Sequence, residues 1–218
     1  MRLKTEAKRQ AILDVAAKAF AELGYEGASM AEICARVGGS KATIYNYFAS
    51  KDELFFDVLT CDRSGFDHAH DPLDPAAPDV RAALQDFGER FIGFLYTPQI
   101  QSNRRLAIGS AARSGIGRLM YEREVSRSQK KIEDFLQAAA MRGDLRLLTP
   151  RLAARQLRAL LEAELIEEYL FQVVQTVTTE DIHGLVQRAV TAFLAIYTPV
   201  ADTRLSAETD PLNPETGE

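Results

Sequence analysis

The feature that most constrains the fold is a Gly-Gly-Ser turn at residues 38–40, which joins two short segments of helical periodicity. The segment before the turn begins with Ser29 and Glu32, whose spacing is that of a capping box at a helix start. Ser40 is placed to cap the segment after the turn, in which Ile44 faces inward. Short helices joined by such a turn have the layout of a helix-turn-helix.

A longer helix precedes this pair, and another follows it. The first is expected to end at Gly24, and its inward face consists of Ile12, Ala16, Ala19, Phe20 and Leu23. Ser50 and Glu53 form a second capping box, so the fourth helix is expected from Leu54 to about residue 66.

Helical periodicity continues through the rest of the chain, with little sign of strands. Further helices are expected at about 79–96, at about 102–112, in a long segment ending near 142, at about 150–174 and at about 178–198. We therefore predict an all-α fold of about nine helices. Residues 1–52 are expected to form one domain, residues 53–198 a second helical domain, and residues 199–218 an acidic, disordered tail.

The helix-turn-helix layout predicts contact with DNA. In this arrangement the helix after the turn presents its first residues to base edges in the major groove. Here those residues are Ser40, Lys41, Ala42 and Thr43, which are small or flexible and carry donors for bases or phosphates. Tyr45 and Tyr47 add hydroxyls suited to phosphate oxygens, and Lys51 adds charge near the next helix start.

The pattern over about residues 8–60 resembles the tetracycline-repressor (TetR) family. The segments that carry the resemblance are 11–20, 24–25, 29–33, 38–48 and 50–54. It implies a two-domain, all-α homodimer whose C-terminal helices bind a small effector and form the dimer interface. Residue by residue, it implies DNA contacts from Ser29, Lys41, Ala42, Thr43, Tyr45, Tyr47 and Lys51. The C-terminal segments 105–108 and 142–145 are similar to the AefR-like branch of the family.

Two residues depart from the family pattern. Gly39 replaces the apolar residue that usually holds the turn, so the third helix is expected to be held less rigidly. Ala31 occupies a position that is polar in some members, which removes one base contact.

Several of these residues also have ordinary structural interpretations. Ser40 could be only a helix cap, the Tyr45 ring could pack on the first helix, and Lys51 could be surface charge. Cys34 is expected to be a small core residue and not a redox sensor. The net charge of −5 does not decide the matter, because residues 1–60 contain as many acidic as basic side chains and the tail is acidic.

The C-terminal half contains the expected effector pocket and dimer interface. The pocket candidates are Phe87, Phe91, Phe94, Leu95, Ile108, Met120, Tyr121, Phe135, Glu164 and Glu168, for which ordinary core is the alternative interpretation. The interface candidates form apolar stripes on the last two helices: Leu157, Leu160, Leu161, Leu165, Leu185, Val186, Ala189, Phe193 and Ile196. Projected on one continuous helix, Glu164 and Glu168 fall within this stripe, so they are expected to be buried or half-buried. At least one of them is expected to face the effector cavity or a cross-subunit arginine, and structural pairing with an arginine such as Arg188 or Arg105 is the alternative.

Other classes of function have little support. No set of nucleophile, base and orienting group stands out, no cofactor is expected, and His68 with His70 lacks a third metal ligand nearby. No membrane-spanning run or signal peptide is seen, and two cysteines make no disulfide framework, so a cytoplasmic, nucleoid-associated protein is expected. The partners expected are palindromic double-stranded DNA, a small molecule and a second copy of the chain. An enzyme or interaction module fused to a DNA-binding head is the alternative.

Overall fold

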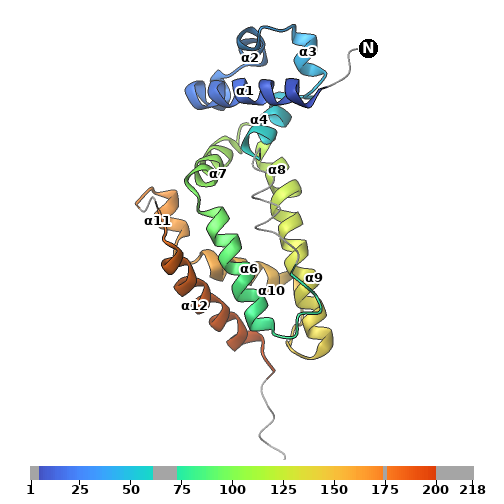
Figure 1. Ribbon diagram of the computed structural model, residues 1–218, viewed down its shortest axis with the longest axis vertical. Helices are drawn as coiled ribbons and strands as arrows, with labels where there is room; N and C mark the ends of the chain where they lie inside the picture. The colour runs from blue at the N-terminus through green and yellow to red at the C-terminus, as the bar shows by residue number, and fades with distance from the viewer. Residues whose placement is uncertain (1–4, 61–72, 174–175, 200–218) are drawn as a thin grey trace, which may run out of the picture.

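The computed structural model describes residues 5–60, 73–173 and 176–199, and every regular element in these ranges is helical (Figure 1). The predicted all-α fold is confirmed. The expected end of the fourth helix, the histidines at 68 and 70, Cys61 and nearly all of the acidic tail lie outside the described residues. The described elements are α1 (Glu6–Gly27), α2 (Met30–Val37), α3 (Lys41–Tyr45), α4 (Lys51–Leu59), α6 (Val80–Leu95), α7 (Pro98–Ser110), α8 (Ile116–Met120), the π-helical turn η1 (Tyr121–Val125), α9 (Ser126–Arg142), α10 (Pro150–Glu162), α11 (Ile166–Leu170) and α12 (Thr179–Tyr197).

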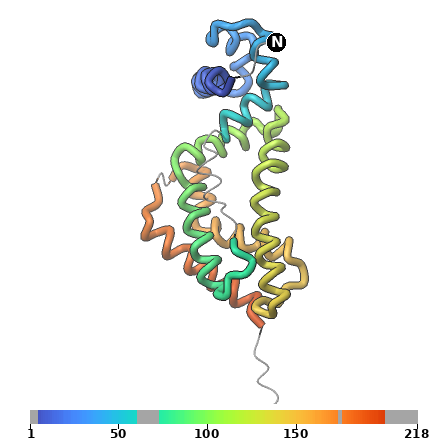
Figure 2. Tube along the Cα trace, turned by 45° about the vertical axis from the view of Figure 1, so that its right-hand side comes forward, coloured from blue at the N-terminus to red at the C-terminus, as the bar shows by residue number. Residues whose placement is uncertain are grey.

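The molecule is elongated, with α1, α2 and α3 at one end and the long helices α6, α9 and α12 extending away from them (Figures 1 and 2). Gly24 breaks the helical path of α1, as expected, because its φ of 68° lies in the left-handed region. A short helical segment then continues to Gly27.

Two separate hydrophobic clusters hold these helices together. The N-terminal cluster joins α1, α2 and α3 to α4, and it also includes Ala107 of α7 and Ile116 of α8. The C-terminal cluster joins α6, α9, α10 and α12. The domain boundary expected after residue 52 differs from the division between the two clusters. Leu54, Phe55 and Phe56 of α4 lie after that boundary but are buried in the N-terminal cluster.

The C-terminal cluster depends on close approach between α6 and α12. Gly88 of α6 is buried, and a Cβ there would lie 2.5 Å from Val186 Cγ1 and 3.0 Å from Leu161 Cδ2. The absence of a side chain at Gly88 therefore lets α6 contact both α10 and α12 closely.

The helix expected at about 150–174 is in fact two helices. Between α10 and α11 the backbone makes i→i+3 turns, in which Ala163 N–H donates to Leu160 O and Leu165 N–H to Glu162 O. No glycine or proline marks this break in the sequence. Because the break changes the angular phase, residues after 162 face directions that a continuous helix does not predict.

Two other helix predictions are corrected. The helix expected at about 102 begins at Pro98, because Thr97 caps it by accepting a hydrogen bond from Ile100 N–H. The long helix ending near 142 ends at Gly143 as expected, but its N-terminal part is divided into α8, η1 and α9.

Candidate DNA-binding surface and effector cavity

The turn between α2 and α3 is held by two short-range devices. Gly38 ends α2 with a left-handed conformation (φ 69°, ψ 31°), which glycine adopts without steric cost. Ser40 then starts α3, since its Oγ accepts a hydrogen bond from Thr43 N–H. Gly39 is exposed, and a Cβ there would meet only ordinary contacts at 3.9 Å, so no apolar anchor is present at this position.

The turn presents an exposed polar edge. Ser40, Lys41 and Ala42 are exposed at the start of α3, whereas Ile44 beneath them is fully buried. Thr43 is half-buried, and its Oγ1 lies 2.9 Å from Ser40 Oγ. Tyr45 retains 44% exposure, and the Lys41 ammonium lies 5.9 Å from its ring centre. Nearly half of the Tyr45 side chain is therefore open to a partner.

The remaining candidate DNA-binding side chains differ in how many hydrogen bonds they already make within the protein. Ser29 is exposed and caps α2 by accepting from Glu32 N–H. Tyr47 is half-buried, and its hydroxyl accepts a hydrogen bond from Thr5 N–H. The Lys51 ammonium donates to Tyr25 O at 2.8 Å and lies 4.0 Å from the Tyr25 ring centre. Lys51 therefore also connects the end of α1 to the start of α4.

A second contact strengthens the same junction. The Tyr25 hydroxyl donates to Asp52, and burial together with this carboxylate raises the pKa of Tyr25. Asp52 also accepts a hydrogen bond from Gly115 N–H at 3.1 Å, just before α8. Asp52 thus joins the DNA-binding end of the molecule to the α7–α8 turn.

A cavity of about 150 Å³ lies where α4, α6, α7, η1, α9 and α10 meet. Its apolar wall includes Leu59, Phe91, Phe94, Leu95, Ile100 and Met120. Its polar wall consists of Thr60, Asn103, Arg104, Glu124, Ser128 and Arg158. A largely apolar hollow with a few polar groups is typical of a small-molecule site.

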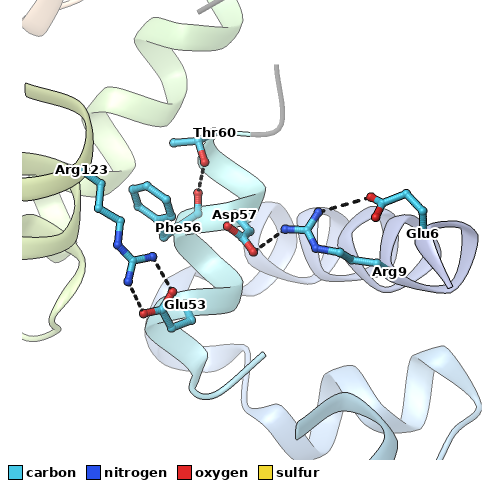
Figure 3. Close-up of polar contacts among 7 residues, drawn as sticks. All are labelled: Glu6, Arg9, Glu53, Phe56, Asp57, Thr60 and Arg123. Atoms are coloured by element: carbon cyan, nitrogen blue, oxygen red, sulfur yellow. Dashed lines mark hydrogen bonds and ion pairs between the residues drawn. The ribbon is translucent and has the colours of Figure 1, made fainter. Parts of the chain in front are cut away.

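Helix α4 connects this cavity to the DNA-binding end. Figure 3 shows α4 lying between two arginines: Arg9 of α1 pairs with Asp57, and Arg123 of η1 pairs with Glu53. The Arg123 guanidinium makes two hydrogen bonds of 2.6 Å to the Glu53 carboxylate and lies 5.0 Å from the Phe56 ring centre. These contacts tie α4 to both halves of the molecule.

Two family models match the chain. Residues 82–199 match the C-terminal domain of AefR-like transcriptional repressors, and residues 12–58 match the tetR family of bacterial regulatory proteins. The chain belongs to the TetR family. It is accordingly a DNA-binding transcriptional regulator and not an enzyme, and both expectations are confirmed.

Individual relatives agree with this TetR assignment. The HTH-type regulator YhgD of Bacillus subtilis is 28% identical over 144 residues, which cover 62% of this chain and 72% of that protein. The HTH-type repressor AcnR of Corynebacterium diphtheriae is 44% identical over 48 residues, 22% of this chain and 25% of that protein. A solved TetR-family regulator from Mesorhizobium loti has a TM-score of 0.75 and 29% identity, over 90% of this chain and all of that one. The flavonoid-responsive regulator FrrA has a TM-score of 0.79 and 25% identity over the same shares.

The structure separates the predicted effector residues of this TetR protein into three groups. Phe91, Phe94, Leu95 and Met120 line the cavity. Phe87 and Phe135 are buried in the C-terminal cluster, which is the alternative considered for them. Ile108 and Tyr121 are 56% and 47% exposed and do not line this cavity.

Glu164 and Glu168 are not buried, contrary to the expectation. Both are exposed, because the break after α10 turns them away from the apolar stripe. Glu164 pairs with Arg188, as the structural alternative predicted, with hydrogen bonds of 2.8 and 2.5 Å that lower its pKa. Both glutamates border a separate polar hollow beside α12 and not the apolar cavity.

The predicted dimer interface is mostly interior. Leu157, Leu161 and Phe193 are fully buried within one subunit, and Leu165, Leu185, Val186 and Ala189 are buried beside them. Leu160 is half-buried, and Ile196 is 55% exposed. The apolar stripes are real, but their buried members face the chain's own core and are not available to a partner; of the predicted interface residues, only Leu160 and Ile196 keep exposed surface.

The buried charge near the cavity was missed in the sequence analysis. Glu162 is 8% exposed, and its carboxylate lies 2.7 Å from Arg104 and 3.9 Å from Arg158. Burial lowers the pKa of the Arg158 guanidinium. Arg158 and Glu162 are four residues apart on α10, and this spacing was the only signal that could have indicated the pair. Across the described residues, no cluster of metal-binding side chains occurs and no helix could cross a membrane.

Proposed function

We propose that this TetR-family protein is a repressor that binds a palindromic operator as a homodimer and is released by a small molecule in the cavity. The observation that carries the proposal is the position of α4. Its last residues, Leu59 and Thr60, form part of the cavity wall, whereas Leu54, Phe55 and Phe56 pack in the DNA-binding core. A ligand that displaces the end of α4 must therefore also act on the DNA-binding end.

The DNA-contacting groups proposed are the exposed ones at the start of α3. Lys41, Ala42 and Thr43 would meet base edges, and Ser29, Ser40, Tyr45 and Tyr47 would hold phosphates. Lys51 is assigned to a phosphate as well, although its ammonium already bonds Tyr25 O. Because its target is operator DNA, the protein is expected to act at the nucleoid in the cytoplasm.

A dimer would use the outward faces of α10 and α12. These faces carry exposed apolar or small side chains in place of the buried stripe: Leu152, Ala159, Ala192, Ala195 and Ile196. Small residues allow two helices to approach closely, and a two-fold interface uses the same patch from both subunits. Two such subunits would present two α3 helices to the two halves of a palindrome.

The test begins with selection of the duplexes that the full-length protein binds. A small-molecule library is then screened for compounds that dissociate the protein from the selected operator. Val125→Phe should abolish release by these compounds, because the larger ring would fill the cavity that Val125 lines. Met141→Phe, at a position 82% exposed on α9, is the control. Compounds that release both variants equally would place the effector outside this cavity.

A further inference from the structure

The polar wall of the cavity contains donors without acceptors. Ser128 is 3% exposed and lines the cavity from α9, and its Oγ has no hydrogen-bond partner among the described residues. Arg104 lines it from α7, and its Nη1 likewise has no partner in the part of the chain that the structure describes. Buried polar atoms are rarely left unpaired in folded proteins, so these two atoms are donors that a hydrogen-bond acceptor in the cavity would satisfy.

The charges beside these donors favour an anion. Arg104 and Arg158 both contact the Glu162 carboxylate, at 2.7 and 3.9 Å. In this partly buried cluster two arginines share one carboxylate. Tyr96 contributes only a neutral hydroxyl, which lies 3.4 Å from Glu162 Oε2. Glu124 also lines the cavity, from η1, and it disfavours an acid group on its own side. An acid group is therefore expected at Arg104 and Ser128.

The rest of the cavity limits the size and shape of the ligand. A protein cavity of roughly 150 Å³ is large enough for one benzene ring. Phe91 and Phe94 contribute aromatic side chains to the wall, and the Arg158 guanidinium lies 5.1 Å from the Phe91 ring centre. A flat, single-ring body fits such a wall better than a long flexible chain.

We propose that the effector is a compact aryl carboxylate, whose acid group is held by Arg104 Nη1 and Ser128 Oγ and whose ring lies against Phe91 and Phe94. This inference rests on the proposed function, since it assigns a ligand class to the cavity described above. A carboxylate would accept hydrogen bonds from both unpaired donors.

The probes are phenylacetate and cinnamate, with their neutral amides and the cation phenethylamine as size-matched comparisons. Calorimetry on the full-length protein measures binding of each probe. The acids are expected to bind at least about tenfold more tightly than the amides, because a carboxylate makes charge-assisted hydrogen bonds where an amide makes neutral ones.

Two variants test the residues. Ser128→Ala should weaken acid binding by roughly three- to tenfold without lowering the melting temperature, since its hydroxyl forms no bond that folding loses. Arg104→Lys keeps a cation for Glu162 but removes the second guanidinium nitrogen, and should weaken acid binding by about tenfold or more. Ser126→Ala and Arg105→Lys, the neighbouring residues that do not line the cavity, are the matched controls.

The outcomes separate the two proposals. If amides or the amine bind as tightly as the acids, and Val125→Phe abolishes that binding, the cavity is a ligand site but the carboxylate assignment is wrong. If the acids bind and neither Ser128→Ala nor Arg104→Lys weakens them beyond the controls, the assignment of the two donors is wrong. If no probe of any charge binds in a way that Val125→Phe abolishes, and no library compound does either, the proposed effector function fails as well.

Discussion

At the residue scale, the DNA-binding turn separates into side chains that are free to meet DNA and side chains that the protein uses itself. Lys41 and Tyr45 are exposed, whereas Thr43 shares a hydrogen bond with Ser40, and Lys51 bonds Tyr25 O. The caps at Ser29, Ser40 and Ser50 were predictable, because a serine three residues before its partner N–H is a local signal. The reciprocal hydrogen bond of a capping box, from the serine N–H to the glutamate carboxylate, was also expected from the sequence. In the structure the Glu32 and Glu53 carboxylates pair with Arg36 and Arg123 instead.

Thr43 and Tyr45 should affect operator binding in different ways. Thr43→Ala is expected to change the preference at particular base pairs by roughly 1–3 kcal/mol, because a base contact carries sequence information. Tyr45→Phe should weaken operator and scrambled DNA about equally, because a phosphate contact does not read sequence. Titrations of both duplexes at several salt concentrations measure this. Equal losses on both duplexes for both variants would contradict this division of roles.

A side chain at Gly88 should destabilise the protein, whereas a side chain at Gly93 on the same helix should be tolerated. The Cβ of Gly88→Ala would press on Val186, so the variant should be destabilised by roughly 1–3 kcal/mol. A Cβ at Gly93 meets nothing within 4 Å, so Gly93→Ala should gain up to about 1 kcal/mol of helix propensity. Urea unfolding of the two variants gives the comparison. Similar stabilities would show that α6 can move away from α12 at little cost.

At the element scale, the break between α10 and α11 explains why part of the site could not be predicted. The apolar positions of α10 were recognised, because their period is a local property of the sequence. The break has no glycine or proline, and it depends on packing of Leu165 and Tyr169 against distant helices. The burial of Glu162 and the exposure of Glu164 follow from that packing, which is not encoded in the neighbouring residues.

The Glu164–Arg188 pair should contribute a small, pH-dependent stability. Its hydrogen bonds keep the pKa of Glu164 below the unfolded value, so the contribution is complete above about pH 4.5 and is lost as the pH falls through the folded pKa. Both side chains are about half exposed, which limits the loss in Glu164→Gln to below about 1 kcal/mol. Glu168→Gln is the control, since Glu168 has no ion-pair partner among the described residues. Urea unfolding should show a difference between the variants at pH 7 that shrinks at pH 2. A loss of operator release in Glu164→Gln would instead assign this residue to the effector site.

The outward face of α12 should control dimerisation. Ala192 is exposed on this face, so Ala192→Glu would place a charge in the interface twice and should yield monomers. Met141→Glu on α9 is the matched control, and it should remain dimeric. Sedimentation velocity distinguishes monomer from dimer. A dimeric Ala192→Glu protein would locate the interface on other helices.

At the scale of the whole molecule, two hydrophobic clusters share one connecting region. Helix α4, with residues of α7 and α8, belongs to the N-terminal cluster, and the last residues of α4 reach the cavity. The sequence predicts the helix-turn-helix and the all-α class well, because both depend on local period and turn chemistry. The arrangement of α4 could not be predicted, since it rests on contacts such as Arg123 with Glu53, which are 70 residues apart.

The central claim is that two copies of this chain read the two halves of one operator through α3. The most direct measurement is binding of full-length protein to the selected palindrome and to a duplex with one half-site destroyed, with stoichiometry by sedimentation. Two chains are expected on the palindrome, and loss of one half-site should weaken binding by roughly 100-fold or more, because the second contact becomes intramolecular in the dimer. One chain per duplex with equal affinity for both would contradict the account.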